Sequence, residues 1–119
     1  MNVTFATVLA ALRGQRLELH NEKELQLQLA VCFGAAGLVL RREKILDARN
    51  TIDFYSAAEG FGIEVKIGGS KAAIYRQCER YCALPAITQL LLLTSKPLGF
   101  PAYIHGKPTQ IFSLGTAWL

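Results

Sequence analysis

The stretch Ile52–Lys66 reads IDFYSAAEGFGIEVK, and it decides the fold of the chain. Apolar and polar residues alternate on both sides of the short segment Ala57–Gly60, which is the pattern of a β-hairpin. Successive side chains of a strand point to opposite faces of the sheet, so Glu64 and Lys66 share a face. Asp53 lies on the polar face of the partner strand. The hairpin therefore gathers two acids and a lysine on one surface.

The register of this hairpin is open between two alternatives. One places Asp53 opposite Glu64, and a turn shifted by one residue places Asp53 opposite Lys66. Both put the three charged groups on one face, with directly opposed Cβ atoms about 5 Å apart, and both put Ile52 and Phe54 on the other face. Two carboxylates this close repel each other, and a divalent cation between them is the usual solution. The alternative is a solvated charged face, which is common on antiparallel strands.

Length and composition indicate one folded domain that spans residues 1–119. The hydrophobic fraction is 51% and the mean hydropathy is +0.25, values of a packed globule that exclude a disordered chain. The longest near-continuous apolar run, Leu29–Leu40, is too short to cross a bilayer. The sequence does not open with a basic segment, an apolar stretch and a cleavage site, so we expect a cytoplasmic protein with no membrane partner.

Charge and cysteine content narrow the class of function further. The net charge of +4 and the isoelectric point near 9.2 favour acidic partners, of which nucleic acid is the commonest. The three cysteines, Cys32, Cys78 and Cys82, are an odd number without zinc-type spacing. We therefore expect reduced, buried thiols and neither zinc nor redox chemistry.

A helix over about Glu22–Ala36 precedes the hairpin, with Asn21 as its N-cap. Glu22 stands at helical spacing from Leu25 and Leu29, on the stripe that should pack against the sheet. This alignment makes Glu22 a candidate ligand that reaches from the helix end toward the hairpin. The alternative is an ordinary first-turn acid that interacts with the helix dipole.

The other expected elements follow from the same periodicities. A helix over Lys71–Ala83 begins after Ser70 and carries Gln77 and Tyr81 one turn apart on one face. The apolar run Ile87–Thr94 is typical of a strand buried on both faces, which implies a right-handed parallel crossover from the hairpin. The remaining elements are a helix over Val3–Arg13, a strand over Leu38–Leu46, a loop-rich segment Gly99–Pro108 and a short strand Thr109–Leu114.

This arrangement resembles the PD-(D/E)XK nuclease superfamily over about Asn21–Thr94. Asp53 resembles the lone acid of the family, and Glu64-Val65-Lys66 resembles its (D/E)XK motif. Glu22 is similar to the helical Glu of the resolvase-like and RecB-like branches, and Gln77–Tyr81 is similar to the QxxxY element of RecB-like nucleases. The chain departs from the family at the residue before Asp53, which is isoleucine instead of proline. The resemblance implies an α/β, restriction-endonuclease-like αβββαβ core, in which helices flank a mixed sheet of four to five strands.

The resemblance also implies an activity and a set of site residues. The activity is that of a Mg²⁺- or Mn²⁺-dependent endo- or exodeoxyribonuclease of a phage, mobile-element or repair type, with RNA still open as a substrate. The implied catalytic residues are Glu22, Asp53, Glu64, Lys66 and Gln77. The implied metal ligands are Glu22, Asp53, Glu64 and the carbonyl of Val65. Lys66 would position the attacking water and stabilise the transition state. We expect contacts with DNA from Arg42, Lys44, Lys71, Arg76 and Tyr81.

Two other classes of protein remain open. One is a catalytically silent module that keeps the nuclease fold and binds nucleic acid without cleaving it. The other is an interaction protein whose charged hairpin face is only solvated. A domain of this size has little surface outside its core to hold a duplex, so we also expect a homodimer or a larger assembly. Its contact would use the apolar segment Leu98–Leu119. Trp118 and Leu119 are consistent with such a contact if they are exposed, and burial in the chain's own core is the open alternative.

Overall fold

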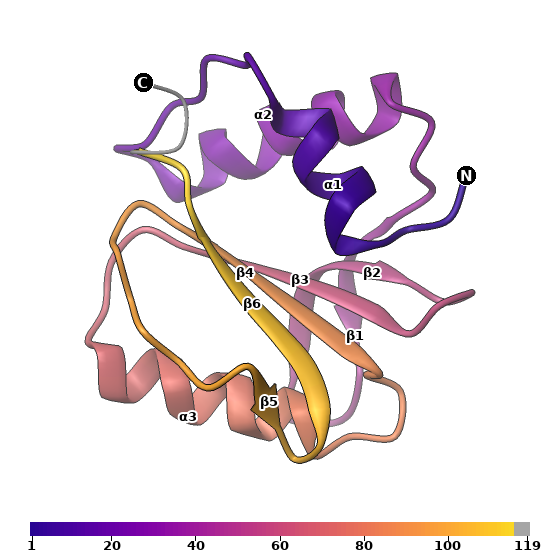
Figure 1. Ribbon diagram of the computed structural model, residues 1–119, viewed down its shortest axis with the longest axis vertical. Coiled ribbons are helices and arrows are strands. Elements are labelled where there is room, and N and C mark those ends of the chain that lie inside the picture. Colours follow the sequence, from indigo (N-terminus) through magenta and orange to yellow (C-terminus); the bar gives the residue numbers. More distant parts are fainter. Residues whose placement is uncertain (116–119) are drawn as a thin grey trace.

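Three helices and a six-stranded mixed sheet make up residues 1–115, the part of the chain that the computed structural model describes (Figure 1). The helices are α1 (Phe5–Leu12), α2 (Glu22–Ala35) and α3 (Lys71–Cys82). The strands are β1 (Arg41–Ile45), β2 (Thr51–Ser56), β3 (Phe61–Lys66), β4 (Gln89–Thr94), β5 (Tyr103–Ile104) and β6 (Lys107–Ser113). Their order in the sheet is β1-β2-β3-β4-β6-β5. Helices α1 and α2 cover one face and α3 covers the other, so the chain is an α/β protein, as predicted.

Each face of the sheet carries its own apolar core. Phe54, Ile63 and Val65 are buried on the face that α1 and α2 cover. Ile52 and Tyr81 are buried on the face that α3 covers. The leucines of β4 alternate between the two cores, because successive side chains of a strand point to opposite faces. The prediction that this strand is buried on both faces is confirmed.

Capping residues begin the two longer helices where the sequence predicted. The Asn21 side chain accepts the Glu24 amide at 3.0 Å at the start of α2. The Ser70 side chain accepts the Ala73 amide at 3.1 Å at the start of α3. Helix α3 connects β3 to β4, which pair in parallel. The expected parallel crossover is therefore present.

The β2–β3 hairpin adopts the first of the two registers. Phe54 pairs with Ile63, and the same register places Asp53 opposite Glu64. Gly60 lies at the end of the turn with a φ of +67°, a conformation that glycine adopts without steric cost. The two acids are thus the residues that face each other where the ladder should continue.

The C-terminal part of the sheet differs from the expected four to five strands. Tyr103–Ile104 forms β5 inside a segment predicted to be a loop, and it pairs antiparallel with β6. The turn between them consists of His105 and Gly106, with φ angles of 50° and 74°. Two positive φ angles are the backbone of a tight two-residue hairpin turn. A two-residue strand has no periodic pattern, so the sequence did not reveal it.

Strand β1 is shorter than predicted, because its apolar beginning belongs to the connection from α2. The Leu38 amide donates to the Phe33 carbonyl at 3.0 Å, which closes the turn after the helix. Leu38 itself is buried in the core beside α2. The strand therefore begins only at Arg41 and consists mostly of the charged residues.

Two expectations concern the membrane and the subunit contact. Within residues 1–115, no helix is long and apolar enough to cross a membrane. Trp118 and Leu119, for which a contact between subunits and burial in the chain's own core were both open, lie outside the described residues.

Candidate functional site

The β1–β2 ladder is interrupted at Asp53. Arg42 pairs with Phe54 and Lys44 pairs with Ile52, but Asp53 between them is not part of the regular pairing. Ile52 is buried in the core under α3, whereas Phe54 is buried in the core under α1 and α2. The prediction that Ile52 and Phe54 share a face is therefore wrong. Strand β2 rotates at the residue between them, Asp53, which is one of the predicted metal ligands.

The Asp53 side chain points toward β3. The Val65 amide donates to Asp53 Oδ2 at 2.8 Å, and the Asp53 amide donates to Glu64 Oε1 at 3.3 Å. These two bonds take the place of the ladder pairing that would continue the hairpin, and they hold the two acids beside each other. Burial raises the pKa of the Asp53 carboxyl above its ordinary value, although the hydrogen bond from Val65 acts in the opposite direction.

Glu64 is the more deeply buried acid of the pair. The residue is 3% exposed, and Glu64 Oε2 lies 3.5 Å from Lys66 Nζ, whose side chain is 26% exposed. Burial and then the negative charge of Asp53 raise the pKa of Glu64 to about 8, while Lys66 lowers it. The predicted placement of Glu64 and Lys66 on one face is confirmed. In the absence of a cation, this site favours a protonated Glu64 at neutral pH.

The N-terminus of α2 meets the end of β3. Glu22 Oε1 accepts the Ile67 amide at 3.1 Å, and the negative charge of Glu22 contributes to the raised pKa of Asp53. The prediction that Glu22 reaches from the helix end to the hairpin is confirmed. Within residues 1–115, however, no group of three or more Asp, Glu, His or Cys side chains is arranged to hold a metal ion. Glu22 lies close enough to Asp53 to influence its pKa, and its carboxylate accepts a hydrogen bond from a backbone amide.

Gln77 and Tyr81 form a hydrogen-bonded pair on α3. Gln77 Nε2 donates to the Tyr81 hydroxyl at 2.9 Å, and that hydroxyl donates to the Thr51 carbonyl at 2.7 Å. Burial, and secondarily the negative charge of Glu64, raises the pKa of Tyr81. Tyr81 is only 1% exposed, so the prediction that it contacts nucleic acid is wrong. Its ring fills the core, and its hydroxyl connects α3 to the start of β2.

The other predicted nucleic-acid contacts lie on different parts of the surface. The Arg42 guanidinium lies 5.7 Å from the centroid of the Phe54 ring, on the face that α1 and α2 cover, so it does not join the site. Lys44 pairs with a β2 residue that is buried under α3, and opposed residues of a ladder share a face. Lys71 and Arg76 are exposed on α3. The structure therefore keeps three of these four cations on the α3 side.

A shallow groove on α3 contains Arg80 and His105, which the sequence did not identify as site residues. It has a volume of about 360 Å³ and is lined by Arg76, Glu79, Arg80, Ala83 and His105. Arg80 follows Arg76 by one helical turn, so helical spacing could have identified it. His105 belongs to the β5–β6 turn and reaches α3 only through tertiary packing, for which no local sequence signal exists.

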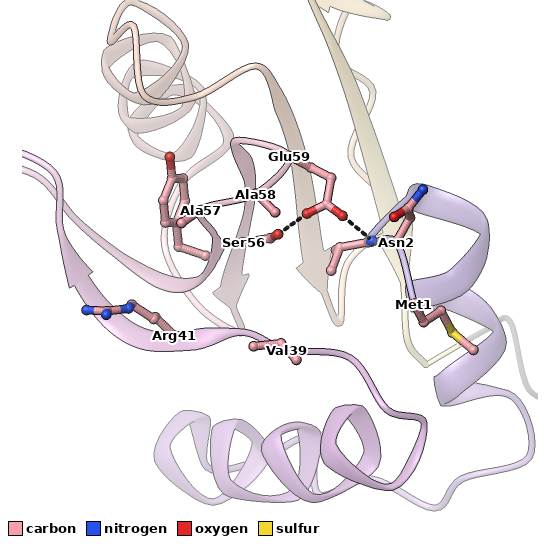
Figure 2. Close-up of a pocket in the computed structure, with 10 residues that line it drawn as sticks. Met1, Asn2, Val39, Arg41, Ser56, Ala57, Ala58 and Glu59 are labelled. Carbon is pink, nitrogen blue, oxygen red and sulfur yellow. Dashed lines mark hydrogen bonds between the residues drawn. The ribbon is translucent and has the colours of Figure 1, made fainter.

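Another cavity, of about 320 Å³, lies at the tip of the β2–β3 hairpin and is separate from the acids (Figure 2). Glu59 accepts hydrogen bonds there from the Ser56 hydroxyl and, at 3.0 Å, from the Val3 amide. These two bonds lower the pKa of Glu59. The carboxylate thus ties the N-terminal segment to the hairpin.

The cysteines have no part in the site. Cys32, Cys78 and Cys82 are free thiols, and the latter two are buried in the core under α3. Burial raises the pKa of Cys78 to about 12, which makes it a poor nucleophile and a poor metal ligand. The expectation of reduced thiols holds, with Cys32 only partly buried.

The Asp53–Glu64 pair fits a divalent cation by its chemistry. Mg²⁺ prefers hard oxygen ligands and is commonly held by one or two carboxylates, with water completing its coordination. Lys66 supplies one positive charge beside the buried Glu64 and the half-buried Asp53, so a bound cation would allow both carboxyl groups to be ionised together. The Val65 side chain is fully buried, so this residue offers the site only its backbone atoms.

Comparisons with protein-family models, with curated proteins and with solved structures give no significant match.

Proposed function

We propose that the chain is a metal-dependent nuclease that hydrolyses DNA phosphodiester bonds. One observation carries this proposal: the carboxyl groups of Asp53 and Glu64 lie together where β2 departs from its regular pairing, and Lys66 lies 3.5 Å from Glu64. A buried and a half-buried acid beside a partly exposed lysine are costly for a structural surface and useful for binding a cation and a phosphate.

The order of the elements supports the same proposal. Helix α2 is followed by the β1–β2–β3 meander, by α3 and by β4, and these four strands are neighbours in the sheet. This succession resembles the core of the PD-(D/E)XK nucleases, with Asp53 on the second strand and Glu64 and Lys66 on the third. Glu22 begins the preceding helix, and Gln77 lies on the following one.

The residues take the following roles in the proposed reaction. Asp53 and Glu64 would hold Mg²⁺ or Mn²⁺, together with the Val65 carbonyl and with Glu22 directly or through water. A bound cation of this kind supplies Lewis acidity to a phosphodiester oxygen and lowers the pKa of a bound water. The Lys66 ammonium orients the attacking water and stabilises the negative charge that develops on the phosphoryl oxygens.

Gln77 and three cations on the α3 side act around this centre. The Gln77 amide nitrogen is engaged with Tyr81, which leaves its carbonyl oxygen as an acceptor for water. Lys44, Lys71 and Arg76 on the α3 side provide positive charge for the phosphate backbone, which dominates the affinity of proteins for nucleic acid.

A second candidate function is the catalytically silent nucleic-acid-binding module. It is favoured by the carboxylates of Asp53 and Glu22, which already accept the amides of Val65 and Ile67. In this alternative, the hydrogen-bonded acids stabilise the fold, and the basic residues bind nucleic acid without turnover.

The test is cleavage of labelled single-stranded, double-stranded and branched DNA, and of RNA, with Mg²⁺, with Mn²⁺ and with EDTA. We expect metal-dependent cutting by the wild type and none by Asp53→Asn, Glu64→Gln or Lys66→Ala. Glu24→Gln and Lys23→Ala change exposed residues of α2 and should cut like the wild type. Tight binding of DNA by folded protein without cutting would establish the silent module. Absence of both binding and cutting would overturn both proposals.

A further inference from the structure

Glu43 has an unusual backbone for a residue inside a strand. Its φ angle is +50°, in the left-handed region that L-amino acids with a Cβ rarely occupy. Glu43 lies in the middle of β1, and its side chain is exposed. Glycine, asparagine and aspartate adopt this conformation most readily, and β-branched residues least readily. A glutamate held in this state indicates that the surrounding structure requires it.

The position of Glu43 coincides with the rotation of β2. In the β1–β2 ladder, Arg42 and Lys44 are paired but Glu43 is not, and the residue that faces it is Asp53. The two strands also change faces together here. Arg42 lies over the ring of Phe54 on the side of α1 and α2, whereas the partner of Lys44 is buried under α3. Both β1 and β2 are therefore irregular at the same rung, the one formed by Glu43 and Asp53.

We propose that Glu43 is a positioning residue, whose left-handed backbone opens this rung and lets the Asp53 carboxylate turn into the plane of the sheet toward the Val65 amide. In a regular ladder, side chains stand roughly perpendicular to the sheet, and a carboxylate in that direction does not accept the backbone amide of the neighbouring strand. An extended Glu43 would close the rung and lose the hydrogen bond from Val65 to Asp53. The backbone part of this inference stands alone, and its consequence for cleavage rests on the proposed function.

Two substitutions at the same position separate backbone conformation from side-chain chemistry. Glu43→Asn and Glu43→Val both remove the carboxylate and shorten the side chain. Asparagine tolerates the left-handed region, whereas valine strongly disfavours it. If the side chain of Glu43 were important through its charge, both variants would lose the same function. If its backbone conformation is important, only the valine variant should change.

The first readout is the Val65 amide, observed by ¹⁵N NMR in the metal-free protein. In Glu43→Asn, its chemical shift and its hydrogen exchange should match the wild type. In Glu43→Val, the exchange should be faster by about tenfold or more, because the acceptor on Asp53 has moved. The second readout is Mn²⁺ affinity by calorimetry, which should fall about tenfold in the valine variant alone, as for other residues that orient a ligand. Cleavage should follow the affinity.

Three results would overturn the inference. The first is a negative φ at Glu43, measured in the wild type from three-bond couplings. The second is a Val65 amide that is unchanged in folded Glu43→Val. The third applies if the valine variant does not fold, in which case Glu43→Gly and Glu43→Ala are compared. The inference expects hydrogen exchange at Val65 to match the wild type in the glycine variant and to be faster in the alanine variant. Equal behaviour of those two variants would contradict the proposal. Because the NMR readout needs neither metal nor DNA, it remains decisive if the nuclease proposal fails.

Discussion

The Asp53 amide donates to the Glu64 carboxylate at 3.3 Å, so one acid of the candidate site is held by the backbone of the other. The Asp53 carboxylate in turn accepts the amide of Val65, the residue after Glu64. This reciprocal pairing fixes both acids on backbone groups of two neighbouring strands. Each hydrogen bond restrains the side-chain rotamer of the acid that accepts it, as a rigid ligand pair requires.

The stability of the metal-free protein should fall as the pH rises from 5 to 8. The pKa of Glu64 is about 8 in the folded protein, above the ordinary value of 4.5. Between these values the folded state binds more protons than the unfolded state, so the free energy of unfolding decreases with pH, by a total on the order of a few kcal/mol, and levels off above the folded pKa. Urea unfolding at several pH values in EDTA measures this. Glu64→Gln should flatten the curve, and the exposed Glu24→Gln should leave it unchanged. A flat wild-type curve would contradict the prediction.

Binding of Mn²⁺ at neutral pH should release a proton. The raised pKa of Glu64 means that its carboxyl is largely protonated at pH 7, and a ligating carboxylate must be ionised. Calorimetry in two buffers of different ionisation enthalpy should show the release of up to about one proton at pH 7 and almost none at pH 9.5. The apparent affinity should rise with pH over this interval. Identical heats in the two buffers at pH 7 would contradict this prediction.

Glu22→Gln and Glu22→Ala should separate the charge of this residue from its hydrogen bond. The Gln side chain can still accept the Ile67 amide, so we expect stability within about 0.5 kcal/mol of the wild type. Loss of the acceptor in Glu22→Ala should cost about 1–2 kcal/mol. If the charge assists the cation, both variants should lose about tenfold in Mn²⁺ affinity. Unaltered affinity in both would limit Glu22 to a structural role.

Tyr81→Phe should destabilise the protein by about 1–2 kcal/mol, because it removes the hydroxyl of a buried side chain that donates to the Thr51 carbonyl and accepts from Gln77 Nε2. The matched control is Tyr103→Phe, since Tyr103 is 64% exposed and water can take the place of any hydrogen bond that its hydroxyl makes. That control should stay within about 0.5 kcal/mol of the wild type. Equal effects in chemical denaturation would show that the buried hydroxyl contributes nothing.

Arg80→Gln should weaken DNA binding and reduce its dependence on salt. Arg80 lines the groove with Arg76 and His105, and an arginine that contacts a phosphate contributes about one unit to the slope of log affinity against log salt. Binding of a labelled oligonucleotide at several salt concentrations measures the slope. Arg13→Gln removes an equal charge at the end of α1 and should leave the slope unchanged. A slope that falls equally in both variants would indicate only the effect of net charge.

Local rules account for most of the architecture. The alternation in Ile52–Lys66 predicted the hairpin, Asn21 and Ser70 predicted helix starts, and the leucines of Ile87–Thr94 predicted a strand buried on both faces. Each of these signals involves residues a few positions apart. The same rules failed for β5, because two residues carry no period, and for the burial of Tyr81, because an amphipathic helix does not specify which edge residue enters the core.

The sequence by itself determined that Asp53, Glu64 and Lys66 come from adjacent strands and that Glu22 begins the helix before them, since hairpin closure and helix capping depend on near neighbours in the chain. Only the tertiary structure decided where the Asp53 carboxylate points. That direction depends on the amide of Val65, twelve positions away, and on the left-handed backbone of Glu43 in the facing strand. Strand periodicity predicts side-chain directions only in a regular ladder, and the β1–β2 ladder is interrupted at Asp53.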